Sequence, residues 1–275
     1  MTVDCLVERA PAKINLALHV RARRPDGYHE LETIFVFAED GDEVCVAPGA
    51  LGLTITGPFA AGLDAGPDNL VNRAQAAFCD AFGVGVAHAI TLDKRLPVAS
   101  GIGGGSADAA ATLRALARLN GVSLDDPRLF AVAAALGSDV PACLLGTASF
   151  GRGRGESLAP IPSLGHVPAL LVNPGVGVST AAVFKAWDGV DRGAIDPDSV
   201  MACRNDLQPP AERLAPVIGE VLGALAAQPG TNLVRMSGSG ATCFALFETR
   251  AARDAADAAI ASGHPDWWRL ATTID

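Results

Sequence analysis

The chain has 275 residues, of which 49% are hydrophobic and 19% are charged, and its formal net charge at pH 7 is −9. This balance excludes a disordered chain, and the acidic excess argues against general binding to nucleic acids or acidic membranes. Because the length exceeds that of a usual single domain, we expect two domains.

The cysteines are widely spaced and form no CxxC pair, which excludes a zinc knuckle and a small disulfide-rich scaffold. They are Cys5, Cys45, Cys79, Cys143, Cys203 and Cys243. Single, scattered cysteines are typical of a reducing compartment. The first residues, MTVDCLVERAPAK, include acids where a signal peptide needs an apolar run, and no stretch is apolar enough to span a bilayer. We therefore expect a cytoplasmic protein.

The beginning of the chain has the period-two alternation of β-strands. This pattern predicts strands at residues 13–20, 31–40, 43–48 and 53–56, with a Pro-Asp-Gly turn between the first two. From Asp68 the apolar residues recur at helical spacing, which predicts a helix over 68–82. Residues 88–94 are then expected to form another strand.

A glycine-rich stretch, PVASGIGGGSADAA at residues 97–110, follows that strand. Its four glycines leave the backbone free to take positive φ, so that successive N–H groups can converge on one anion. Ser106 then opens an apolar-periodic segment, expected to be a helix that closes at Asn120. A glycine loop entering a helix N-terminus favours a phosphate site, although no lysine follows as in a Walker loop and GxGxxG does not fit. A glycine connector without a ligand remains an alternative.

The rest of the chain alternates helices and strands. A helix is expected from Asp126 to Leu136 and β-structure from 138 to 151, and the proline-rich segment 159–168 is interpreted as a connection between domains. We therefore predict domains at residues 1–160 and 161–275. In the second half we expect strands at 169–173 and 267–274, a strand-turn-strand at 233–247, and helices at 180–187, 211–227 and 250–261.

Several ordered segments resemble the GHMP small-molecule kinases over nearly the full length. They are PAKINLALHV, RPDGYHELET, DNLVNRA, LDKRLPVASGIGGGSADAA, LGSDVPACL, NPGVGVSTAAVF and SGSGATCFALF. Within that superfamily, the chain is most similar to the branch that phosphorylates a cytidine-diphosphate-linked methylerythritol on its 2-hydroxyl, in isoprenoid precursor biosynthesis. The resemblance implies an α+β, two-domain GHMP kinase fold, with a β-rich α/β N-terminal domain that carries the ATP loop and a ferredoxin-like C-terminal domain. It also implies ATP and Mg²⁺.

The family's catalytic lysine and aspartate correspond to Lys13 in PAKIN and Asp139 in GSDVP. A carboxylate within hydrogen-bond reach can take the proton of an alcohol as it attacks, and an ammonium can stabilise the developing alkoxide. Taken alone, the lysine could be a solvated charge at a strand start, and the aspartate could cap a turn.

The resemblance assigns the ATP phosphates to the glycine loop and adenine to Asn69 and Lys94. The loop residues are Pro97, Val98, Ala99, Ser100, Gly101, Ile102, Gly103, Gly104, Gly105, Ser106 and Ala107. Asn69 could equally cap the helix that follows it. Ser106 could offer its hydroxyl to Mg²⁺, but we assign the metal no protein ligand and expect phosphate oxygens and water to hold it.

For the cytidine base, the family places ring side chains at positions occupied by Tyr28, His29 and Phe184, and Asn15 is expected to reach the erythritol or its phosphates. Base stacking on such rings contributes on the order of 1–3 kcal/mol per base. Tyr28 could instead pack over its own turn, and Phe184 could lie in a helix core. The expected partner is thus a small-molecule substrate, with no nucleic acid or membrane, and the protein is expected to be a monomer or homodimer. A homoserine-type or mevalonate-type kinase, or a non-catalytic nucleotide-binding module, are the alternatives.

Overall fold

The computed structural model describes residues 5–275, which divide into two compact units. Unit 1 contains the chain up to Ala12 together with Asp40–Val98 and Gly103–Gly146, and unit 2 contains Lys13–Glu39, Ala99–Ile102 and Thr147–Asp275. Each unit therefore takes in three stretches of the chain. The predicted domains were two continuous ranges that meet at residue 160, whereas each unit is built from separate stretches. The boundary at residue 160 therefore stays a prediction.

The first two strands are much longer than the alternation predicted. β1 spans Leu6–Arg23 and β2 spans His29–Pro48, so the strands expected at 31–40 and 43–48 are one continuous strand. Gly41 explains this continuity, since a Cβ at that position would lie 2.1 Å from the Ala10 carbonyl oxygen. Only glycine allows the backbones to approach so closely there.

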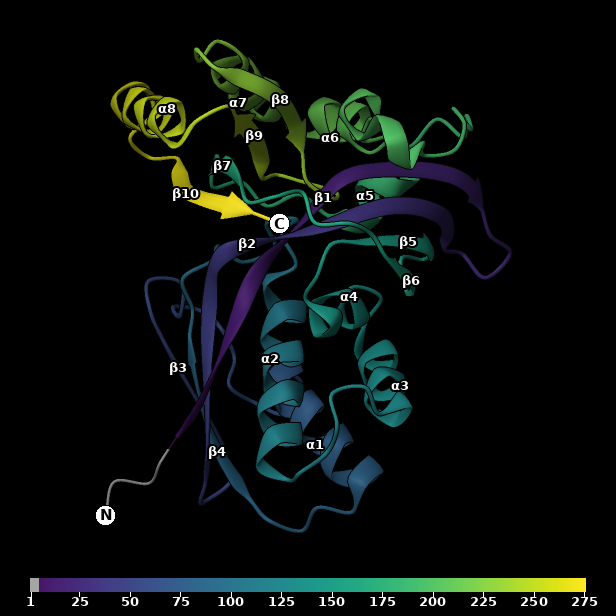
Figure 1. The fold of residues 1–275 in the computed structure, drawn as a ribbon, viewed down its shortest axis with the longest axis vertical. Coiled ribbons are helices and arrows are strands. Elements are labelled where there is room, and N and C mark those ends of the chain that lie inside the picture. The colour runs from purple at the N-terminus through teal and green to yellow at the C-terminus, as the bar shows by residue number, and fades with distance from the viewer. Residues whose placement is uncertain (1–4) are drawn as a thin grey trace. The chain divides into compact units, whose positions relative to one another are not determined.

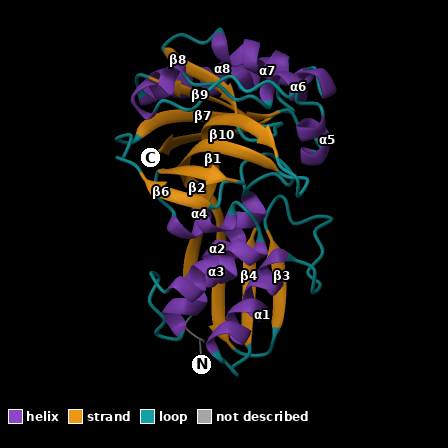
Figure 2. Cartoon of the chain, turned by 90° about the vertical axis from the view of Figure 1, so that its right-hand side faces the viewer, coloured by secondary structure: helices purple, strands orange, loops and turns teal. Residues whose placement is uncertain are grey.

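In unit 1, four helices lie on one side of a small sheet (Figures 1 and 2). β4 (His88–Asp93) pairs parallel with β3 (Gly52–Thr56) and antiparallel with the Glu43–Pro48 part of β2. The helices are α1 (Leu70–Phe82), α2 (Gly104–Leu119), α3 (Pro127–Leu136) and α4 (Val140–Leu145). α2 packs against α1 and α4, and most of its length is buried. The core of unit 1 thus holds the helix that begins at the glycine loop.

Helix α4 corrects the β-structure expected from residue 138. Pro141 lies in the first turn, where its missing N–H costs no hydrogen bond, and Gly146 ends the helix in the left-handed conformation. The strand β5 (Ser149–Gly153) begins only after this cap, and it forms a hairpin with β6 (Ser157–Pro160) that pairs with Leu31–Phe35 of β2.

Unit 2 contains an antiparallel sheet covered on one face by helices (Figure 2). The strands lie in the order β10 (Trp268–Ile274), β7 (Val167–Asn173), β9 (Cys243–Phe247), β8 (Thr231–Met236). The helices are α5 (Thr180–Lys185), α6 (Gln208–Leu214), α7 (Val217–Ala226) and α8 (Arg250–Gly263), with a 3-10 turn at Pro197–Ala202. The single helix predicted at 211–227 is two helices, because Ala215 leaves the helical conformation and Pro216 caps the start of α7.

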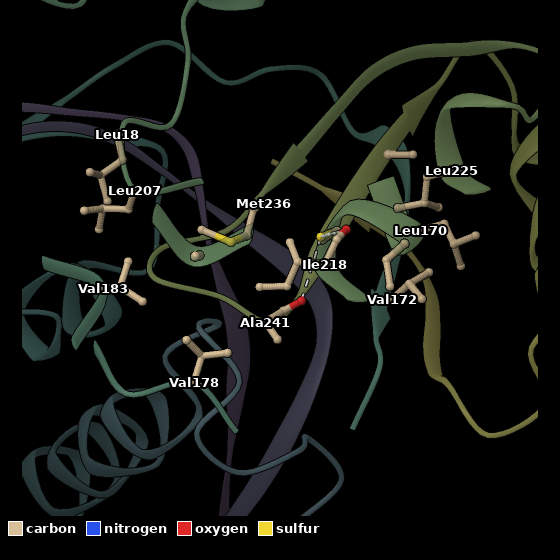
Figure 3. Close-up of a cluster of buried hydrophobic side chains, with 14 of the residues drawn as sticks. Leu18, Leu170, Val172, Val178, Val183, Leu207, Ile218, Leu225, Met236 and Ala241 are labelled. Carbon is tan, nitrogen blue, oxygen red and sulfur yellow. Dashed lines mark hydrogen bonds between the residues drawn. The ribbon is translucent and has the colours of Figure 1, made fainter. Parts of the chain in front are cut away.

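The core of unit 2 anchors the loop after β8. Ile218 and Leu225 of α7 pack with Leu170 of β7 and with other apolar side chains (Figure 3). Met236 and Ala241, at either end of the segment 237–240, are both fully buried in this cluster. Each buried apolar side chain of this size contributes about 1.5–3 kcal/mol. The core therefore fixes both ends of that segment.

The cysteine spacing predicted no disulfide, whereas the structure pairs Cys5 with Cys45, with their Cα atoms 5.8 Å apart. The pairing of β1 with β2 brings these distant positions together, and spacing along the chain carries no sign of it. The disulfide does not involve Cys79, Cys143, Cys203 or Cys243. Across the part of the chain that the structure describes, no helix has the length and apolarity needed to cross a bilayer.

Candidate active site

Lys13 and Asn15 lie on the same face of β1 in unit 2, as strand alternation requires of residues two apart. The Lys13 Nζ donates a 2.8 Å hydrogen bond to Asn15 Oδ1 and lies 5.4 Å from the centre of the Phe35 ring. Its backbone N–H donates to the Ile102 carbonyl at 3.0 Å. Asn15 therefore holds the ammonium, the backbone of Lys13 is bonded to the glycine loop, and the side chain is no solvated charge.

Two residues that sequence reasoning missed hold Asn15. Its side-chain amide donates to Thr33 Oγ1 at 2.8 Å, and its backbone N–H donates to Ser237 Oγ at 3.1 Å. Thr33 in turn donates to the Ala17 carbonyl. The partners lie on β2 and in the loop after β8, so no local pattern in the sequence could have identified them.

The loop at residues 237–242 packs directly on the part of the glycine loop that belongs to unit 2. Ser237 Oγ donates to the Gly101 carbonyl, and the Thr242 N–H donates to the Ser100 carbonyl. Gly101 has φ of 78°, and a Cβ there would lie 2.6 Å from the Gly240 carbonyl oxygen. The glycine at position 101 is thus required by both its backbone conformation and its close contact.

In unit 1 the glycine loop runs into the N-terminus of α2. Gly103 caps the helix with φ of 66° and no side-chain hydrogen bond, and the first helical bond joins the Ala107 N–H to the Gly103 carbonyl. The preceding amides, from Gly104 to Ser106, have no acceptor within the helix. Together with the helix dipole, these donors fit an anion, and the Ser106 hydroxyl lies in the same first turn.

Lys94 is part of a buried charge cluster beside this helix. Its ammonium donates to Asp42 and, at 2.7 Å, to Asp108 of α2, and the side chains of all three residues are nearly inaccessible. Burial raises the pKa of Asp108 to about 7, while the charge of Lys94 opposes the shift. Burial opposes a charge on Lys94 too, but the two carboxylates outweigh it and raise the pKa of Lys94. No local sequence pattern indicates this ion-pair role, and the adenine contact of Lys94 stays a prediction.

Asn69 caps α1, which was one of the two roles considered for it. Its Oδ1 accepts from the Val71 N–H at 3.0 Å, and its Nδ2 donates to the Asp64 carbonyl at 2.8 Å. A contact to adenine remains a prediction beside this structural role.

Asp139 lies at the start of α4 in unit 1, but its side chain makes no capping hydrogen bond to the helix. Its backbone carbonyl accepts from the Cys143 N–H instead. The carboxylate therefore does not cap α4, and the catalytic role stays a prediction.

The ring residues predicted for base binding lie in unit 2. Tyr28 is 55% exposed, with the Arg154 guanidinium 4.9 Å from its ring centre, so it is not packed in a core. The rings of His29 and Phe184 have centroids 4.9 Å apart, and Trp187 meets His29 edge-on at 5.7 Å. The structure thus brings His29 and Phe184 together and adds Arg154 and Trp187, which sequence reasoning missed.

One ring nitrogen of His29 is available to bond a ligand. Its Nε2 is buried and makes no hydrogen bond within the described chain. Burial, and to a smaller extent the charge of Arg23, lowers the pKa of His29 below its usual value. A neutral imidazole with an unpaired nitrogen between rings can recognise a polar edge of a flat ligand.

Within residues 5–275, no group of three or more His, Cys, Asp or Glu side chains could hold a metal ion by itself. The described residues nevertheless include a helix N-terminus whose amides fit an anion, a buried ammonium whose backbone is bonded to the glycine loop, and a group of ring side chains.

Two family models match the chain, described as the GHMP kinases N terminal domain, over residues 69–147, and the GHMP kinases C terminal, over residues 193–265. The chain is 56% identical to the 4-diphosphocytidyl-2-C-methyl-D-erythritol kinase of Rhizorhabdus wittichii, over 97% of this chain and 94% of the relative. It is 51% identical to the enzyme of the same name from Novosphingobium aromaticivorans, over 96% and 91% of the two chains.

Solved structures agree with the sequence relatives. A crystal structure of 4-(cytidine 5'-diphospho)-2C-methyl-D-erythritol kinase matches with a TM-score of 0.83 at 38% identity, over 98% of this chain and 99% of that one. A homoserine kinase from Cytophaga hutchinsonii matches with a TM-score of 0.73, but at 18% identity it shows a shared fold alone. Together these findings confirm the two-domain GHMP kinase fold.

Proposed function

Because the chain belongs to the 4-diphosphocytidyl-2-C-methyl-D-erythritol kinase family of the GHMP kinases, we propose that it phosphorylates the 2-hydroxyl of that cytidine-linked methylerythritol with ATP. The observation that carries the proposal is the buried Lys13 ammonium, which donates to Asn15, while the backbone N–H of Lys13 donates to the glycine-loop carbonyl of Ile102. A homoserine-type or mevalonate-type acceptor is the alternative, and the relatives at 47–56% identity speak against it.

In this proposal Asp139 accepts the proton of the acceptor hydroxyl as the oxygen attacks the γ-phosphorus of ATP. Such a positioned base accelerates a reaction by about 100-fold to 10,000-fold. Lys13 stabilises the negative charge that develops on the oxygen, and Asn15 fixes the direction of its ammonium. The phosphoryl group moves directly from ATP to the alcohol, without a phosphoenzyme.

The N-terminus of α2 fits the phosphates of ATP. A Cβ at Gly105 would meet no atom within 4 Å, so this position faces open space, and the amide donors of the first turn lack helical acceptors. Bound Mg²⁺ would neutralise charge on the phosphate oxygens, and the Ser106 hydroxyl is a protein oxygen that this turn could offer it. Asn69 and Lys94 are proposed to border the adenine.

Recognition of the cytidine is assigned to Tyr28, His29 and Phe184. The exposed Tyr28 ring offers a face for stacking, and the unpaired His29 Nε2 offers a hydrogen bond to a base edge. A polar group that is buried and unpaired without the ligand makes a site strongly selective for ligands that satisfy it. Phosphorylation of a metabolic alcohol by ATP is a reaction of the cytoplasm, and we propose the cytoplasm as the location. We still expect a monomer or a homodimer.

The test is an ADP-release assay with four acceptors at equal concentration: the cytidine-linked methylerythritol, free methylerythritol phosphate, mevalonate and homoserine. We expect kcat/KM for the cytidine-linked acceptor to exceed that for each of the others by more than about 100-fold. Equal or faster turnover of mevalonate or homoserine would overturn the assignment of the acceptor, and no ADP release with any acceptor would overturn the kinase itself.

A further inference from the structure

A cavity of about 310 Å³ lies in unit 2 beside α6. Of the residues described above around the predicted base site, Trp187 alone lines it, and the residues assigned to ATP and to the catalytic step do not. Its size is at the lower end of small-molecule sites. The walls contain four arginines but only two carboxylates: Arg192, Arg204, Arg213, Arg235, Asp188 and Asp206. In a chain with net charge −9, this is a local excess of positive charge.

Both carboxylates are already paired within the wall. Asp188 binds the guanidinium of Arg192, and Asp206 accepts from Arg204 Nε at 2.6 Å and from the Val20 N–H at 2.9 Å. Within each pair the charges of the arginine and the aspartate cancel. The surplus positive charge therefore comes from the two remaining arginines.

Arg213 and Arg235 have no carboxylate at ion-pair distance among the residues described. Arg213 donates to the Ala186 carbonyl at 3.0 Å. Arg235 is 5% exposed and donates to the carbonyls of Leu16 and Cys203, and burial lowers its pKa to about 10. A buried guanidinium whose partners are carbonyls keeps its full charge uncompensated, and this is costly unless an anion comes close.

Two further wall residues add donors and a connection. Trp187 is almost fully buried, and its indole N–H has no acceptor in the described chain. The side-chain amide of Asn205 donates to the carbonyls of Met236, at 2.7 Å, and of Gly238, at 2.8 Å. Asn205 thus joins this cavity to the loop that packs on Gly101.

We propose that this cavity is a second anion site, which binds a small molecule carrying a phosphate or diphosphate group. The unpaired charges of Arg213 and Arg235 supply the attraction, and guanidinium groups match phosphate oxygens in geometry. Asn205 lines the cavity and is hydrogen-bonded to the loop at 237–242, which in turn contacts the glycine loop. Binding of a phosphorylated metabolite in the cavity can therefore alter the position of the glycine loop.

The test measures binding of inorganic phosphate and of inorganic pyrophosphate to the full chain by calorimetry, in wild type and in Arg213→Gln, Arg213→Lys and Arg128→Gln proteins. Arg213 is exposed and makes a single carbonyl contact, so its replacement leaves the fold intact. Arg128 is another exposed arginine, on α3 in unit 1, and serves as the control. Phosphate that bound only at the glycine loop would not respond to any change at Arg213.

We expect pyrophosphate to bind more tightly than phosphate, and Arg213→Gln to weaken it at least tenfold, with Arg213→Lys in between and Arg128→Gln unchanged. Trp187 fluorescence, measured in a protein with Trp267→Phe and Trp268→Phe, should change on binding. Equal affinity of wild type and Arg213→Gln would overturn the proposal, as would no binding of either anion up to millimolar concentrations. Should Arg213→Gln not fold, Arg192→Gln lowers the same wall charge and must weaken binding too.

Discussion

The ammonium of Lys13 and the side-chain oxygen of Asn15 form a 2.8 Å hydrogen bond in which both side chains are only 3% exposed. A buried ammonium is costly unless hydrogen-bond partners lie close by. The bond therefore sets the direction in which the charge of Lys13 acts, and Thr33 and Ser237 set the position of Asn15. Lys13 and Asn15 thus act as one unit.

Replacing Asn15 should slow the reaction without preventing folding. A hydrogen bond to a charged group is worth about 1.5–3 kcal/mol, so Asn15→Ala is expected to lower kcat by roughly 10-fold to 100-fold while the KM for ATP changes little. Asn232→Ala, at an exposed position on β8, is the control and should keep wild-type rates. A kcat for Asn15→Ala within twofold of wild type would show that the bond does not position Lys13.

Two glycines of the loop should respond in opposite ways to alanine. Gly101 has positive φ and carbonyl oxygens too close for a Cβ, so Gly101→Ala should lower the free energy of unfolding by about 1–3 kcal/mol. Gly105 is helical with open space around it, and Gly105→Ala should leave stability unchanged or raise it by up to about 1 kcal/mol. Urea unfolding of the two variants checks this, and a loss of equal size in both would refute the role given to Gly101.

The charge cluster at Asp108 predicts a pH dependence of stability. Its pKa in the folded protein is raised to about 7, so the folded state holds the proton more tightly than the unfolded chain does. The stabilisation is complete below the unfolded pKa near 4 and is lost as the pH rises through about 7. Wild type should therefore lose unfolding free energy between pH 5 and pH 8 relative to Asp108→Asn, which has no proton to release there. Parallel pH profiles of the two proteins would contradict this.

His29 predicts an effect of pH on substrate affinity. Its pKa lies below the ordinary histidine value, so the imidazole is neutral at pH 7 and acquires charge only on acidification. Protonation of His29 places a positive charge near Arg23 and within the ring cluster, which we expect to weaken binding of the base. The KM for the cytidine-linked acceptor should be flat from pH 7 to 8 and rise toward pH 5.5, whereas the KM for ATP should not follow it. A His29→Asn protein should lack this acid-side rise, and a wild-type KM that stays constant to pH 5.5 would contradict the role of His29.

The sequence predicted those features that local patterns determine. Apolar periodicity placed α1, the acids and proline at 125–127 indicated the start of α3, and the run of glycines before Ser106 indicated the N-terminus of α2. Periodicity failed where a single residue decides the outcome. Pro216 divides one apolar stretch into α6 and α7. Gly41 allows β2 to continue where the alternation predicted a gap between two strands.

Partners that are distant along the chain could not be predicted, because nothing in a single sequence records which strands become neighbours. Ser237 meets Asn15 across 222 positions, and Asp42 reaches Lys94 across 52. Lys94 was thus assigned by resemblance to a nucleotide contact, while its two buried carboxylates escaped notice. The disulfide between Cys5 and Cys45 was missed for the same reason.

The role of Asp139 tests the account most directly, through the single-turnover rate of phosphoryl transfer to the cytidine-linked acceptor in an Asp139→Asn protein. Asparagine has the same shape but cannot take a proton, so the rate should fall by at least about 100-fold while ATP still binds. Asp125→Asn, an exposed aspartate just before α3, should react at the wild-type rate. A rate for Asp139→Asn within a few-fold of wild type would contradict proton removal by Asp139.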